Sequence, residues 1–140
     1  MATFEEIMNT LSDNLQSAAQ LTPQERSKIT LAGANVFKDE LEKVTREKHL
    51  SNKKGGKYGH MADGLTANNK NVDGILDGKS TVGWSSKFHA TNARRLNDGT
   101  KKYTADHFVT NVQNSEKVAE KVRDAEFEEY KEIMSKKGLI

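Results

Sequence analysis

Residues 21–44 read LTPQERSKITLAGANVFKDELEKV, and this stretch begins a helix. Thr22 has the residue type of an N-cap, Pro23 suits the first helical position, and Glu25 completes a capping box with Thr22. Apolar residues then recur at helical spacing, at Ile29, Ala32, Val36, Phe37, Leu41 and Val44. The sequence therefore predicts a helix from Pro23 to about Lys48.

A second helix is predicted immediately before this one, from Thr3 to about Gln20. Thr3 and Glu6 form another capping box. An apolar face follows at helical spacing, at Phe4, Ile7, Met8, Leu11, Leu15, Ala18 and Ala19. Two helices joined so closely form an N-terminal helix pair, and a helix–turn–helix raises the question of DNA binding.

The composition limits what the protein can be. The chain has 140 residues, of which 34% are hydrophobic and 30% are charged, so we expect a modest core with exposed segments. The absence of cysteine excludes disulfides, thiolate metal sites and cysteine nucleophiles. No apolar run is long enough to cross a membrane, and the acidic N-terminus is unlike a signal peptide. We expect a soluble protein that is intracellular or virion-borne, with no membrane partner.

The middle of the chain is predicted to form a small antiparallel sheet of about three strands. The expected strands are residues 60–67, 72–76 and 79–85, with Asn68–Asn71 and Asp77-Gly78 as the turns between them. Together with the flanking helices this gives an α+β fold.

The last part of the chain is predicted to be helical. A short helix over Phe88–Leu96 ends where Gly99 takes a left-handed conformation. Thr104 or Asp106 then caps a long C-terminal helix, with a separate helix capped by Ser115 as the alternative. We expect the sheet to pack against this long helix. Three apolar residues, Phe88, Leu96 and Phe108, are expected to pack the short helix against the sheet and the long helix.

The predicted organisation is one domain with an internal loop. Residues 1–48 are the N-terminal helical segment, residues 49–59 a mobile loop rich in Lys and Gly, and residues 60–140 the sheet with the C-terminal helix. The net charge is +2, but residues 41–102 hold 13 basic and 6 acidic side chains. This basic middle is either a solvated surface, a site for phosphate backbones or a charged patch that meets another protein.

The candidate residues for contact with a neighbour or with DNA lie in the loop and around the turn after the short helix. They are Lys53, Lys54, Lys57, Arg94, Arg95, Asp98, Gly99, Thr100, Lys101 and Lys102.

No motif in the sequence predicts a catalytic, metal or cofactor site. Gly78-Lys79-Ser80 resembles the end of a phosphate-binding loop, but position 73 is Asp where that motif needs Gly. Asn69–Gly74 resembles the start of a calcium loop, but Ser80 stands where a bidentate Glu is required. The four histidines have no pairing at helical spacing. We therefore expect no enzyme activity and no cofactor.

Three blocks in the second half of the chain carry a family resemblance. They read HMADGL at residues 60–65, TVGW at residues 81–84 and ATNARRLNDGTKKYTADHF at residues 90–108. In this order and spacing they resemble the small neck, or head–tail connector, proteins of long-tailed bacteriophages, which are also called tail-completion proteins. The chain departs from that pattern at Asn97-Asp98, where an acidic–aromatic pair is usual, and at Asp106-His107, where proline is common.

The resemblance implies a non-enzymatic virion protein of the phage neck, with an α+β fold. It implies a homo-oligomeric ring of six subunits, or of twelve, through which DNA passes. The ring would join a head-closure or adaptor protein to a tail terminator or tail tube protein. The implied location is the virion, with the host cytoplasm during assembly.

Two other functions remain open at this point. The basic middle is also compatible with a small nucleic-acid-binding accessory protein, which would bind duplex DNA as a monomer with a steep salt dependence. An enzyme regulator or toxin–antitoxin partner is a third class, for which no feature of the sequence argues.

Overall fold

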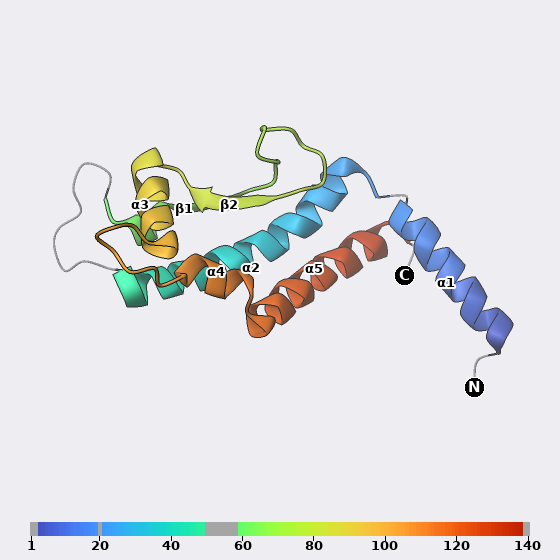
Figure 1. Cartoon of the computed structure of the whole chain (residues 1–140). Helices are drawn as coiled ribbons and strands as arrows, with labels where there is room; N and C mark the ends of the chain where they lie inside the picture. Colours follow the sequence, from blue (N-terminus) through green and yellow to red (C-terminus); the bar gives the residue numbers. More distant parts are fainter. Residues whose placement is uncertain (1–2, 20, 50–58, 139–140) are drawn as a thin grey trace.

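The computed structural model describes residues 3–19, 21–49 and 59–138, with the side chains of 13–19 left out. The chain is α+β, as expected (Figure 1). In chain order its elements are α1 (Phe4–Ala19), α2 (Pro23–His49), the 3-10 helix η1 (Met61–Gly64), β1 (Leu65–Asn68), β2 (Thr81–Trp84), α3 (Lys87–Asp98), α4 (Phe108–Gln113) and α5 (Glu116–Lys136).

Helix α2 is the element on which the rest of the body packs. The sheet lies along one side of α2 and α5 runs along another side, antiparallel to it (Figure 1). Two ion pairs join the helices along their length. Lys137 Nζ lies 2.8 Å from Glu25 Oε1, and Lys121 Nζ lies 2.7 Å from Glu40 Oε1. The main helical partner of the sheet is thus α2 and not the C-terminal helix.

The two predicted capping boxes are confirmed. The Thr3 and Glu6 side chains accept hydrogen bonds from each other's backbone N–H groups at 3.2 and 3.1 Å. Thr22 and Glu25 do the same at 3.1 and 3.0 Å. Each box satisfies N–H groups that have no partner within the helix, so both helix starts are fixed by local sequence.

The sheet has two antiparallel strands, not three, with Leu65 opposite Trp84 and Asn68 opposite Thr81. The expected first strand begins instead with the 3-10 helix η1. The expected middle strand, residues 72–76, is a turn because the Asn71 side chain accepts hydrogen bonds from the backbone N–H groups of Asp73 and Ile75. These N–H groups are therefore not available to a β ladder.

The predicted tight hairpin turn at Asp77-Gly78 is also wrong. Gly78 lies against α2, where its N–H donates to the Ser27 hydroxyl at 3.1 Å and its carbonyl accepts from the Thr30 hydroxyl at 3.0 Å. These contacts anchor the long connection between β1 and β2 to the first half of α2, so the two strands are not joined by a tight turn.

The core forms where α2, the sheet, α3 and α4 meet. Phe108 is fully buried, and its ring packs edge-on against Trp84 with the centroids 6.5 Å apart. Leu96 packs at the margin of this core. Phe88 does not face inward as expected, because it is 60% exposed. The buried positions of α3 are instead His89, Ala93 and Asn97, which are spaced four residues apart and so share one helix face.

The prediction of a single long C-terminal helix from Thr104 or Asp106 is wrong, and the alternative, a separate helix capped by Ser115, is confirmed. Helix α4 ends at Gln113, and the Ser115 hydroxyl then accepts a hydrogen bond from the Val118 N–H at 3.3 Å as the cap of α5. No helix among the described residues is long and apolar enough to span a membrane.

Candidate functional site

The predicted interface turn follows directly from the end of α3. Gly99 has φ 84°, a conformation that side chains disfavour, and a Cβ at this position would lie 2.9 Å from the Ala105 nitrogen. The Thr100 hydroxyl accepts hydrogen bonds from the N–H groups of Lys102 and Tyr103, each at 3.1 Å. The turn is thus closed by its own residues, and the next segment returns toward α3. The expected positive φ at Gly99 is confirmed.

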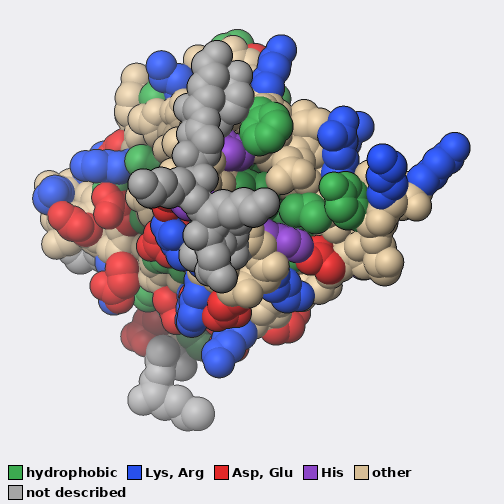
Figure 2. All heavy atoms as spheres, turned by 90° about the vertical axis from the view of Figure 1, so that its left-hand side faces the viewer, with side chains coloured by type: hydrophobic (Ala, Val, Ile, Leu, Met, Phe, Trp, Pro, Cys, Tyr) green, Lys and Arg blue, Asp and Glu red, His purple; other side chains and the backbone are tan. Residues whose placement is uncertain are grey.

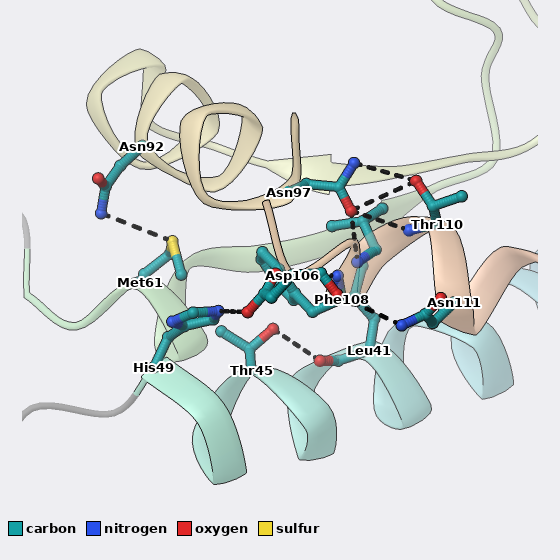
Figure 3. Close-up of polar contacts among 11 residues, drawn as sticks. Leu41, Thr45, His49, Met61, Asn92, Asn97, Asp106, Phe108, Thr110 and Asn111 are labelled. Atoms are coloured by element: carbon teal, nitrogen blue, oxygen red, sulfur yellow. Dashed lines mark hydrogen bonds and ion pairs between the residues drawn. The ribbon is translucent and has the colours of Figure 1, made fainter. Parts of the chain in front are cut away.

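Asn97 joins the end of α3 to the start of α4. Its side-chain oxygen accepts hydrogen bonds from the N–H groups of Val109 at 2.9 Å and Thr110 at 3.0 Å (Figure 3). Its amide nitrogen donates to the Thr110 hydroxyl at 3.0 Å and to Asp98 at 2.9 Å. Asn97 is only 9% exposed, so water has little access to this place. Its side chain therefore supplies the hydrogen-bond partners that these backbone N–H groups need.

The far end of α2 holds the other side of this turn. His49 Nε2 lies 2.6 Å from Asp106 Oδ2, while Asp106 Oδ1 accepts a hydrogen bond from the Phe108 N–H at 3.1 Å (Figure 3). The His49 ring also packs edge-on against Phe108, with the centroids 4.6 Å apart. The turn that carries the basic residues is therefore fixed at both ends to the core.

The basic residues of this turn surround a shallow hollow of about 430 Å³. Its lining consists of Arg95, Thr100, Lys101, Lys102 and Tyr103, so no acidic side chain lines it. Figure 2 shows Lys and Arg side chains projecting from the edge of this end of the molecule, with acidic side chains among them. Arg95 near the end of α3 and Lys101 and Lys102 on the turn together form a surface suited to phosphate groups or to an acidic protein patch.

The structure brings together only some of the residues predicted for this interface. Arg95, Thr100, Lys101 and Lys102 share the hollow, and Gly99 lies beside it in the backbone. Arg94 is exposed on α3 but does not line the hollow, while the exposed Asp98 accepts from the Asn97 amide. Lys53, Lys54 and Lys57 lie outside the described residues, as does most of the predicted mobile loop over residues 49–59.

A second surface is an apolar groove between α2 and the helices α4 and α5. It encloses about 330 Å³, and its apolar lining comes from Val44, Phe108, Val112 and Val118. Charged residues line it as well, namely Glu40, Lys43, Glu47, Lys48, Lys117 and Lys121. Lys121 pairs with Glu40 and lowers the pKa of that carboxyl. The other three lysines form no ion pair within the described part of the chain.

A third surface is the apolar face of α1. Figure 1 shows this helix extending from the body beyond the start of α2. Phe4 is 78% exposed, and Ile7, Met8 and Leu11 are each about half exposed. Their spacing puts all four on one side of the helix. An apolar stripe of this length is typical of a surface that packs against a partner.

Sequence reasoning did not find several residues that shape these surfaces. Asn97 was noted only as part of a departure from a family pattern, although its short polar side chain is typical of a cap. Asp106 was predicted, with Thr104, as a cap of the C-terminal helix, and its carboxylate accepts a hydrogen bond from the first N–H of α4. The apolar face of α1 was recognised from its helical spacing, but its residues were not among the candidate interface residues. Among the described residues, no cluster of three His, Asp or Glu side chains could hold a metal ion.

Comparison with protein families gives one match. A family model described as "Bacteriophage HK97-gp10, putative tail-component" matches residues 9–99. This range covers more than half of the chain, from α1 through α3. Comparison with curated proteins and with solved structures gave no match.

Proposed function

The chain belongs to the HK97-gp10-like family of bacteriophage tail components, and we propose that it acts in the phage neck as a ring that joins head to tail. Membership of this family makes it a structural component of the virion. The ring, the neck position and the joining role are the proposal. The observation that carries it is the exposed apolar stripe of α1, on a subunit that already has its own core.

A closed ring requires each subunit to present two unlike surfaces, one for each neighbour. The described residues supply such a pair. Helix α1 contains acidic and no basic residues, while the basic turn and the lysine-lined groove lie on the body. Complementary charge of this kind sets the register of association and speeds the encounter of subunits.

The proposed ring has six subunits, with twelve as the alternative, and DNA passes through it. On the head side it meets a head-closure or adaptor protein, and on the tail side a tail terminator or tail tube protein. The hollow around Arg95, Lys101 and Lys102 faces either a neighbouring protein or the DNA. The residues with exposed charge on this turn are therefore the ones we expect to matter for assembly and not for folding.

Light scattering of the purified protein tests the ring. The mass is measured over a range of protein and salt concentrations, with duplex DNA added in a parallel series. We expect a discrete oligomer of six or twelve subunits whose mass is unaffected by duplex DNA. A monomer that binds duplex DNA and releases it steeply with salt would contradict the ring proposal.

The basic hollow supports a second candidate function, nucleic-acid binding by the free subunit. Its test is the double variant Lys101→Glu/Lys102→Glu, with Lys131→Glu/Lys136→Glu on α5 as a control of equal charge change. If the second candidate holds, only the variant in the turn loses DNA affinity, and the salt dependence becomes shallower. Equal loss in both variants would mean that net charge alone drives DNA binding.

A further inference from the structure

The apolar stripe of α1 is exposed, and within the described residues this helix makes no extensive contact with another element. Helix α1 begins with an acidic turn, Glu5-Glu6, and contains no Lys or Arg. At 100° per residue, Glu5 lies at the flank of the stripe formed by Phe4, Ile7, Met8 and Leu11. The helix therefore presents an apolar ridge with negative charge beside it.

The groove between α2, α4 and α5 has the complementary character. Its floor is apolar, with Phe108 and Val112 buried beneath it. Lys43, Lys48, Lys117 and Glu47 lie at its edge, while Lys121 is paired with Glu40, so the lining holds four lysines and two glutamates and is net basic. An amphipathic helix with an acidic flank fits an apolar groove with a basic edge, which is a common mode of helix recognition.

The groove and the helix of one chain lie too far apart to meet in the observed arrangement. Helix α1 joins α2 at its first turn and leads away from it (Figure 1). The groove lies beside Val44, about 32 Å further along α2 at 1.5 Å per residue. A helix from another molecule meets no such restriction.

We infer that α1 of one subunit docks its apolar stripe into the α2–α4–α5 groove of a second copy of this chain. This inference rests on the self-association proposed above and names the surfaces that carry it. Each subunit gives its helix to one neighbour and receives a helix from the other. Such a head-to-tail contact closes into a ring when a whole number of the rotations between neighbouring subunits adds up to 360°.

Site-specific crosslinking tests this contact cleanly, because the natural chain contains no cysteine. Ile7→Cys places a thiol on the stripe, and Lys117→Cys places one at the groove edge. The two variants are mixed, one of them carrying a size tag, and treated with a short bis-maleimide. We expect a linked pair of unlike size from this mixture, at least tenfold above the yield with the control Lys131→Cys on the distal part of α5.

The effect of a new charge on self-association, compared between the two faces of α1, tests the contact independently. Ile7→Glu puts a carboxylate in the stripe, whereas the matched control Asn9→Glu adds the same charge to the polar face. We expect Ile7→Glu to weaken self-association at least tenfold and Asn9→Glu to stay within twofold of the natural protein. Circular dichroism of each variant confirms that the body remains folded.

The outcomes separate this contact from the proposed function. An oligomer whose mass is unchanged by Ile7→Glu, and which gives no Ile7–Lys117 link above the control, overturns the docking while the ring stands. A dimer that links these positions supports the docking and contradicts the ring. A protein that is monomeric at every concentration overturns both.

Discussion

His49 Nε2 lies 2.6 Å from Asp106 Oδ2, which joins the last residue of α2 to the loop that leads into α4. The same carboxylate accepts a hydrogen bond from the Phe108 N–H through its other oxygen. One side chain therefore holds the end of the long helix, the return of the basic turn and the start of α4 together. The position of the turn depends on this link and on the Asn97 cap.

Replacing Asp106 with Ala is expected to destabilise the protein by about 2 kcal/mol, because it removes both the acceptor of the Phe108 N–H at the start of α4 and the contact with His49. Urea unfolding measures this loss. Asp124→Ala, at an exposed position on α5, is the matched control and should change stability by less than about 0.5 kcal/mol. Equal stability of the two variants would show that the link contributes nothing.

Asn97→Ala is expected to cost about 2–3 kcal/mol, since it leaves the N–H groups of Val109 and Thr110 without their acceptor in a largely buried position. Asn92→Ala on the same helix, which loses only a contact of 4.0 Å to the Met61 sulfur, is the comparison. Thermal unfolding of both variants checks the difference. A melting temperature for Asn97→Ala at or above that of Asn92→Ala would contradict the role given to the cap.

Gly99→Val is expected to destabilise the fold by about 2 kcal/mol or more. A β-branched residue resists the positive φ at this position, and its Cβ would collide with the backbone of Ala105. Gly83→Val in β2 is the control, because no atom lies within 4 Å of a Cβ there. An unchanged melting temperature for Gly99→Val would show that the turn does not need its glycine.

Glu126→Gln is expected to raise stability at neutral pH. Burial raises the pKa of the Glu126 carboxyl, so the folded state favours the protonated acid and loses stability as pH rises through and above the ordinary range for Glu. The amide removes this cost at pH 7, whereas at pH 3 the acid is protonated in both states and the variant should match the natural protein. Melting temperatures at the two pH values measure this, with Glu120→Gln as the exposed control. A lower melting temperature for Glu126→Gln than for the natural protein at pH 7 would contradict the expected stabilisation.

Local signals in the sequence were sufficient to predict where α1, α2 and α5 begin. The pairs Thr3–Glu6 and Thr22–Glu25 and the Ser115 cap each join residues three apart, so their structure follows from the chain around them. The family resemblance also led to the α+β class and to a phage structural protein, both of which are confirmed.

The other predictions failed because side-chain hydrogen bonds, both local and between distant segments, override simple apolar patterns. The expected middle strand was lost to the Asn71 side chain, whose hydrogen bonds compete with strand pairing. Phe88 was placed inward because apolar residues were assumed to mark the buried face of α3, whereas that face contains His89 and Asn97. Asn97 caps α4 by accepting from the N–H groups of Val109 and Thr110, which are 12 and 13 residues later in the chain. Sequence spacing alone does not reveal such a pairing.

If this protein joins phage heads to tails as we propose, deletion of its gene from the phage genome is the most direct test. Electron microscopy of the resulting lysate shows whether particles assemble. We expect DNA-filled heads and complete tails that remain separate, and that join once the natural protein is supplied in trans. Intact infectious virions from which mass spectrometry shows the protein to be absent would contradict this role.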